Sequence, residues 1–173
     1  MSEDPKASRR SLLGGLVGVG ACALGAAVAA PVVVFVAAPA GASPKSGERF
    51  VRTVPLDSLA VGKPVLVNLV GKDTDAWTTH PAIELGSAWL VRTGPREVRA
   101  LSSTCPHLGC AVQRDGDGFT CPCHTSAFGV DGKRKEGPAP RDLDELAVRI
   151  DDGVVAVDFK RFRIGVAEKV QVG

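Results

Sequence analysis

Four of the five cysteines and two of the three histidines lie in two short segments, and this arrangement constrains the fold more than any other feature. The first segment is residues 105–110 (CPHLGC), and the second is residues 121–126 (CPCHTS). Each offers a thiolate and an imidazole, which are ligand types that bind zinc and iron. Clustered cysteines of this kind indicate a metal site or a disulfide rather than scattered core thiols.

Two kinds of metal site can use these residues. A two-iron cluster would take Cys105 and Cys121 on one iron, and His107 and His124 on the other. Replacing two thiolates by neutral imidazoles lowers the negative charge of such a cluster, and places its reduction potential between about −150 and +300 mV. A structural zinc site with the same ligands is the alternative, although it leaves the other two cysteines of the segments unexplained. A catalytic Cys–His pair does not account for two similar segments.

The N-terminal part of the chain is apolar. No charged residue occurs from Leu12 to Ala38. As a helix rising ~1.5 Å per residue, this run spans about 40 Å, against a hydrocarbon core of ~30 Å. We therefore expect residues 12–38 to form a single transmembrane anchor after a cytoplasmic N-terminus of residues 1–11. A cleaved signal peptide and a lipoprotein attached through Cys22 are alternatives, but neither needs so long a run.

Two adjacent arginines, Arg9 and Arg10, stand before the apolar run and resemble the twin-arginine (Tat) export signal, which is read by a translocase for folded proteins. Basic residues at this place also predict an N-terminus that stays on the inner side of a bacterial plasma membrane. The rest of the chain would then lie on the periplasmic or outer side. Residues 39–47 (PAGASPKSG) read as a linker, either an inert spacer or a hinge.

Residues 48–173 are expected to form an all-β domain. Short apolar or alternating runs predict strands, and Asp-Gly pairs such as Asp152-Gly153 predict tight hairpin turns between them. The net charge of +2 comes from interleaved acids and bases, which excludes a broad basic face for nucleic acid. We expect the basic stretch Lys160–Arg163 to be a solvated end. The predicted strands are Phe50–Val54, Pro64–Val70, Ala82–Arg92, Val98–Ser102, Ala147–Ile150 and Val154–Phe159.

The pattern C-x-H-x-G-C followed by C-P-C-H-x-S resembles the Rieske iron–sulfur proteins of cytochrome bc-type complexes. The resemblance implies an antiparallel β-sandwich whose cluster-binding part lies at about residues 103–141. It also implies one 2Fe-2S cluster per subunit, and a disulfide between Cys110 and Cys123 that ties the two segments together. The ligands that it implies are Cys105, His107, Cys121 and His124.

Further residues extend the resemblance. Gly137-Pro138-Ala139-Pro140 resembles the proline loop that covers the cluster in this family, and Ser126 matches a serine that hydrogen-bonds a bridging sulfide. Phe128 stands where many high-potential relatives carry a tyrosine, which predicts a lower reduction potential here. Thr125 replaces the usual glycine of the second segment.

The function implied by the resemblance is electron transfer within a quinol:cytochrome c oxidoreductase, as one subunit of a multi-subunit respiratory complex. His124 would accept the proton of quinol, and Leu108 would dock against a cytochrome b subunit. A c-type cytochrome would then receive the electron. The alternative is the Rieske small subunit of a periplasmic oxidase such as arsenite oxidase. The soluble ferredoxin of an aromatic-ring dioxygenase fits poorly, because such ferredoxins usually lack the two disulfide cysteines.

Overall fold

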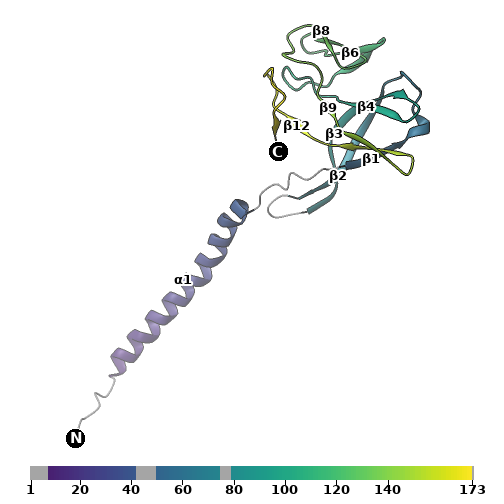
Figure 1. The fold of residues 1–173 in the computed structure, drawn as a ribbon. Helices are drawn as coiled ribbons and strands as arrows, with labels where there is room; N and C mark the ends of the chain where they lie inside the picture. Colours follow the sequence, from purple (N-terminus) through teal and green to yellow (C-terminus); the bar gives the residue numbers. More distant parts are fainter. Residues whose placement is uncertain (1–7, 42–49, 75–78, 173) are drawn as a thin grey trace. The chain divides into compact units, whose positions relative to one another are not determined.

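The computed structural model describes residues 8–41, 50–74 and 79–172. The chain divides into two compact units, one ending at Ser43 and the other beginning at Pro44. The first is a single helix and the second consists of β-strands (Figure 1).

Helix α1 spans Arg9–Gly41 and is exposed along its described length. Ser8 caps its first turn, because the Ser8 hydroxyl and carbonyl oxygens both accept the Ser11 N–H, at 3.3 and 2.9 Å. Within the described residues, α1 alone is long and apolar enough to cross a membrane. It extends about one turn beyond the predicted anchor at each end. The first residues of the predicted linker, up to Gly41, are therefore helical, and the rest of that linker lies outside the described residues.

The β unit has a base made of two antiparallel sheets. The register of one sheet pairs Phe50 with Asp158 and Val148 with Val157. That sheet has the order β1-β11-β10, formed by Phe50–Pro55, Val154–Asp158 and Val148–Asp151. The other has the order β2-β3-β4-β9, formed by Val65–Thr74, Thr79–Gly94, Glu97–Ser102 and Glu145–Leu146. A short 3₁₀ helix, Leu56–Ser58, follows β1.

The core of the base collects apolar side chains from both sheets. Leu69 and Leu90 from one sheet and Val155 and Val157 from the other have no exposed surface. Alternation along the strands produces this packing, because successive side chains of a strand point to opposite faces of the sheet.

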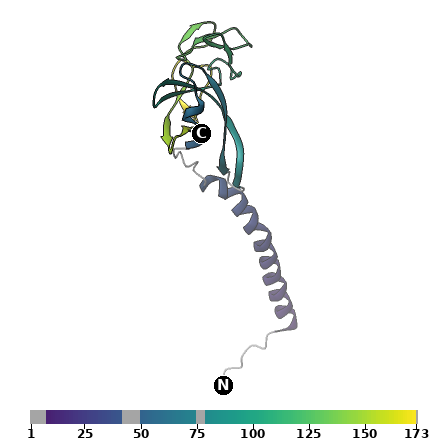
Figure 2. The same cartoon turned by 90° about the vertical axis from the view of Figure 1, so that its right-hand side faces the viewer.

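A smaller four-stranded sheet is inserted between β4 and β9, and we call residues 103–143 the cluster lobe. It has the order β5-β6-β7-β8, formed by Gln113–Asp115, Gly118–Thr120, Ala127–Gly129 and Arg134–Glu136. Its core is separate from that of the base and includes Phe119, Phe128 and Trp89, whose Nε1 donates to Val112 O at 3.3 Å. The lobe lies at one end of the β unit (Figures 1 and 2).

The last described residues form a C-terminal hairpin, which we define as residues 161–172. Its two short strands, β12 (Arg161–Phe162) and β13 (Gln171–Val172), pair in antiparallel fashion. The hairpin runs along one flank of the β unit (Figure 1).

The predicted all-β, antiparallel fold is confirmed, including the hairpin turn at Asp152-Gly153. Both turn residues have positive φ, +50° and +74°, as a tight turn between β10 and β11 requires. The three-residue strands of the cluster lobe were not among the predicted strands, and the C-terminal hairpin was not predicted either. In the basic stretch Lys160–Arg163, Arg161 and Arg163 are exposed as expected, although Arg161 also donates to Leu85 O at 3.3 Å and lies over the Phe159 ring.

Candidate metal centre

The first loop, residues 105–110, joins β4 to β5 in a tight turn. The Cys105 N–H donates to Cys110 O at 2.8 Å, and the Gly109 N–H donates to Cys105 O at 3.0 Å. Gly109 has φ +85°, a left-handed conformation that costs a glycine little. The loop therefore closes on itself, with Cys105 at its base.

The second loop, residues 121–126, joins β6 to β7 and repeats the same turn. The Cys121 N–H donates to Ser126 O at 2.8 Å, and the Thr125 N–H donates to Cys121 O at 3.0 Å. Thr125 has φ +56°, so the residue that departs from the family pattern occupies the left-handed position that Gly109 fills in the first loop. A β-branched residue is strained in this conformation.

The two loops bring the four predicted ligands together in two like pairs. Cys105 and Cys121 are buried, with 0% and 2% of their surface exposed, and the Cys121 thiol is close enough to raise the pKa of the Cys105 thiol. The imidazole rings of His107 and His124 lie edge to face, with centroids 4.9 Å apart. His107 is half-buried and His124 is exposed.

The surroundings of the buried Cys105 thiol favour its neutral form. Burial raises the pKa of the Cys105 thiol, and a hydrogen bond from the His107 backbone opposes this. The Cys121 thiol raises that pKa further, whereas a hydrogen bond with Ser126 lowers it. A metal cation reverses the balance, because its charge keeps coordinating thiols deprotonated.

The disulfide implied by the resemblance is present. Cys110 and Cys123 are bonded, with their Cα atoms 6.6 Å apart, and so join the end of the first loop to the second. The Cys121 sulfur lies within 4.8 Å of both disulfide sulfurs. A disulfide sulfur has no thiolate to offer, so the thiols that these loops leave for a metal are those of Cys105 and Cys121.

The proline loop, residues 137–140, packs on the second loop. The Ala139 N–H donates to the Ser126 hydroxyl oxygen at 3.1 Å, and Ser126 is fully buried. A Cβ on Gly137 would lie 2.4 Å from Ser126 Cα, so only glycine permits this approach. Pro138 is exposed and Pro140 is half-buried.

Two more predicted residues lie at the edges of the site. Leu108, at the tip of the first loop, has 58% of its surface exposed. Phe128 follows the second loop and is 1% exposed, within the core of the cluster lobe.

Sequence reasoning missed the contacts of the C-terminal hairpin with the first loop. The Gly165 N–H donates to Pro106 O at 2.8 Å, and a Cβ on Gly109 would lie 3.6 Å from Ile164 Cδ1. The first is a hydrogen bond between backbone groups and the second is a van der Waals contact of ordinary length, so no residue pattern predicts them.

The donor set fits a two-iron cluster with mixed ligands. The site has one pair of thiols and one pair of imidazoles. In such a cluster the thiols ligate one iron and the imidazoles the other. The fully buried Ser126 hydroxyl beside Cys105 adds a hydrogen-bonding group at the thiol side.

Comparison with known proteins gives the family. The family described as "Rieske [2Fe-2S] domain" matches residues 50–148. The cytochrome b6-f complex iron-sulfur subunit of Synechococcus sp. (strain JA-2-3B'a(2-13)) is 32% identical over 162 residues, which cover 86% of this chain and 86% of that protein. The menaquinol:cytochrome c reductase iron-sulfur subunit of Bacillus subtilis (strain 168) is 33% identical over 153 residues, covering 84% and 88%.

A third relative matches a shorter stretch. The ubiquinol-cytochrome c reductase iron-sulfur subunit of Rhodobacter capsulatus is 36% identical over 112 residues, which cover 60% of this chain and 54% of that protein. With the family match over most of the β unit and two relatives aligned over most of their length, the chain belongs to the Rieske iron–sulfur proteins, whose domain carries a [2Fe-2S] cluster.

Proposed function

We propose that this chain is the electron-carrying subunit of a membrane-bound quinol:cytochrome oxidoreductase of the bc type. Its cluster ligands would be Cys105 and Cys121 on one iron, and His107 and His124 on the other. The observation that carries the proposal is the meeting of two alike loops, which hold a buried thiol pair and an imidazole pair with one exposed ring. The relatives that align over most of the chain are named as iron–sulfur subunits of such complexes.

The exposed imidazole of His124 is the part of the site that a substrate can reach. When bound, a histidine-ligated two-iron cluster takes up and gives back one electron. A coordinated imidazole keeps its second ring nitrogen free, so it can hold a proton or a hydrogen bond at that atom. His124 is exposed and His107 half-buried, so His124 is the residue that would hydrogen-bond a quinol hydroxyl and accept its proton.

The surface around the imidazoles suits docking against an apolar partner. Leu108 projects from the first loop with more than half of its surface exposed, whereas Cys105 beneath it is fully buried. We assign Leu108 to the contact with a cytochrome b subunit, where burying it would stabilise the docked state by about 2 kcal/mol. The proline loop packs on the other side of the site and would keep water from the thiol pair.

Helix α1 would anchor the chain in a bacterial plasma membrane with its N-terminus inside. Arg9 and Arg10 at its start favour this orientation, and α1 is long enough to cross the hydrocarbon core. The Cys110–Cys123 disulfide is also suited to the oxidising outer side. In this arrangement, the β unit would take electrons from quinol at cytochrome b and pass them to a c-type cytochrome.

Spectroscopy of membranes that contain the full chain tests the proposal. Low-temperature EPR after dithionite reduction should give the rhombic signal with a low average g-value that histidine-ligated two-iron clusters show. Quinol should reduce the oxidised cluster and so produce the same signal, and cytochrome reduction by quinol should require the chain. A protein with stoichiometric zinc and no signal would overturn the ligand assignment. A cluster reduced by a separate periplasmic oxidase, and not by quinol, would make the chain an accessory subunit of that oxidase.

The docking role of Leu108 has a matched control in the base. Leu108→Asp should slow quinol oxidation roughly thirtyfold, the equivalent of losing about 2 kcal/mol of apolar contact, with an unchanged EPR signal. Leu66 on β2 has 48% of its surface exposed and lies in the base, so Leu66→Asp should leave the rate unchanged. Equal rates for the two variants would remove Leu108 from the docking surface.

A further inference from the structure

The turn of the C-terminal hairpin lies against the first loop. Its Gly165 N–H donates to Pro106 O at 2.8 Å, next to the candidate ligand His107. A Cβ on Gly165 would lie 3.7 Å from His107 O, so the two backbones are close along this stretch. Ile164 is in contact range of Gly109 on the same loop. The hairpin therefore contacts the first loop from Pro106 to Gly109.

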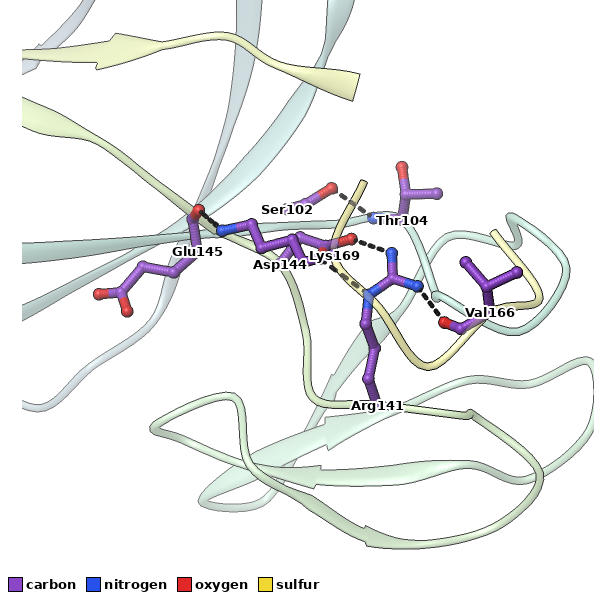
Figure 3. A network of polar contacts seen from close by, with 7 residues as sticks. All are labelled: Ser102, Thr104, Arg141, Asp144, Glu145, Val166 and Lys169. Carbon is purple, nitrogen blue, oxygen red and sulfur yellow. Dashed lines mark hydrogen bonds and ion pairs between the residues drawn. The ribbon is translucent and has the colours of Figure 1, made fainter. Parts of the chain in front are cut away.

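The rest of the hairpin is fastened to the base. Arg161 donates to Leu85 O at 3.3 Å, and Lys169 Nζ donates to Glu145 O at 2.6 Å. Lys169 also lies 4.6 Å from the centre of the Phe162 ring, across the hairpin. Figure 3 shows Lys169 reaching the Glu145 carbonyl from the hairpin. The hairpin is thus held by the base at one end and meets the first loop at the other.

Arg141 secures the turn of the hairpin to the cluster lobe. Its Nε and Nη2 donate to the two carboxylate oxygens of Asp144, at 3.0 and 2.7 Å, and its Nη1 donates to Val166 O at 2.5 Å. Figure 3 shows the guanidinium between Asp144 and Val166. The side chains of Arg141 and Asp144 are only 9% and 7% exposed. Arg141 directly follows the proline loop, so it joins that loop to the hairpin.

The chemistry of Arg141 is specific to this task. A guanidinium presents several N–H donors in a rigid plane, so it can hold a carboxylate with two of them and a carbonyl with a third. A lysine ammonium could neutralise Asp144, but it has no fixed fork with which to satisfy both partners. Val166 stands next to Gly165, so the position of Val166 O sets that of the donor to Pro106.

We propose that the C-terminal hairpin is a clamp that fixes the first loop, and that Arg141 is the positioning residue that holds the clamp closed. The proposal rests on the ligand set proposed above, because it concerns the orientation of His107. Outer contacts of this kind hold a ligand in its binding geometry and tune the bound metal. The hairpin contacts the first loop directly, and the proline loop covers the second loop.

The test compares Arg141→Lys with Arg99→Lys in the full chain, purified from membranes in detergent. Arg99 makes an exposed ion pair with Glu145, at 2.9 Å and with side chains 38% and 56% exposed, and donates to Asp131 O. Arg141→Lys should shift the g-values of the reduced protein and speed cluster loss several-fold, while thermal unfolding of the base stays close to wild type. Arg99→Lys should change none of these. A purely structural role for Arg141 would lower the unfolding temperature and leave the g-values unchanged, and this would overturn the proposal.

A second variant and a second readout keep the test decisive. A chain that stops after Arg163 lacks the Gly165 donor and the Val166 acceptor, and should show larger changes in the same direction. Amide hydrogen exchange at Gly109, whose N–H donates to Cys105 O, should be several-fold faster in this variant and in Arg141→Lys. Unchanged exchange and unchanged g-values in the truncated chain would overturn the clamp. Exchange is measured with or without a bound cluster, so it decides the clamp even if the proposed ligand set fails.

Discussion

The first and second loops are one turn built twice from different residues. In each, the first cysteine donates to the carbonyl five residues later and accepts from the N–H four residues later. The histidines differ in place, however. His107 is two residues after its cysteine, whereas His124 is three residues after Cys121, because Cys123 takes the intervening place for the disulfide. His107 is half-buried and His124 is exposed.

The two loops also differ in what supports them. The first loop is contacted by the C-terminal hairpin through Gly165, and the second is covered by the proline loop through Ala139. The disulfide is the one covalent link between them. A repeated backbone turn can thus present one imidazole to a partner and keep the other sheltered, because position within the turn and neighbouring segments decide exposure.

The largest effect should come from cutting the link between the loops. Replacing Cys110 and Cys123 together by serine should lower the free energy of unfolding by about 3 kcal/mol, since the disulfide no longer restricts the unfolded chain. Chemical denaturation of the full chain in detergent measures this, and cluster absorbance should be lost at the same time. Cys22→Ser in α1 is the matched control and should be silent. A double variant as stable as wild type would show that the loops hold together without the bridge.

The next largest loss of stability should come from a change in the proline loop, which covers the second loop. Gly137→Ala places a methyl group against Ser126 Cα at a residue whose φ is +87°. Gly116→Ala has a positive φ too, +53°, but no atom within 4 Å of the new methyl, so it isolates the cost of the backbone conformation. We expect Gly137→Ala to lower the free energy of unfolding by about 2 kcal/mol more than Gly116→Ala. Equal losses in thermal or chemical unfolding would mean that the proline loop moves aside freely.

The two loops place different residues at the left-handed position, Gly109 in the first loop and Thr125 in the second, and substitutions there should change stability in opposite directions. Gly109→Ala should destabilise the protein by about 1 kcal/mol, since alanine is strained at that φ. Thr125→Gly should stabilise it by about 0.5 kcal/mol, because relief of the same strain is partly offset by greater freedom of the unfolded chain. Denaturation curves for both variants give the two signs. A loss of stability in Thr125→Gly would show that the hydrogen bond from its hydroxyl to His124 O outweighs the strain.

The smallest change concerns electronics rather than stability. Phe128 stands seven residues after Cys121, the first cysteine of the second loop. Val112 holds the same place after the first cysteine of the first loop, and both side chains are buried. Phe128→Tyr should raise the reduction potential by about 40 mV, the one-electron equivalent of a hydrogen bond worth about 1 kcal/mol. Redox titration followed by EPR measures it, with Phe128→Leu as a control for size alone. A potential that fails to rise would refute the role assigned to the missing hydroxyl.

The sequence predicted the long strands because their side chains alternate over enough residues to show a period. The Val154–Phe159 run and the Asp152-Gly153 turn correspond closely to β11 and its hairpin. Strands of three residues, such as β7 and β8, are too short to show any period, and they form because neighbouring loops bring them together.

The site and its proline loop were predicted through the family resemblance, whereas the contacts of the C-terminal hairpin were not predicted. Spacing alone left zinc and iron open, and only the resemblance implied the Cys110–Cys123 pairing that the structure contains. The clamp involves backbone groups of Gly165 and Val166, which every sequence possesses. A threonine does not by itself indicate a left-handed backbone, and the signal at Thr125 was that it replaces a glycine of the family pattern.

The insertion of the cluster lobe between β4 and β9 has a consequence for the order of folding. The base closes only when β1 pairs with β11, so that Phe50 meets Asp158 across most of the domain. The lobe is built from neighbours in sequence, with β5, β6, β7 and β8 paired in succession. Local contacts form faster than distant ones. We therefore expect a chain emerging from the ribosome to shape its two loops early, and to add the contacts of Gly165 after them.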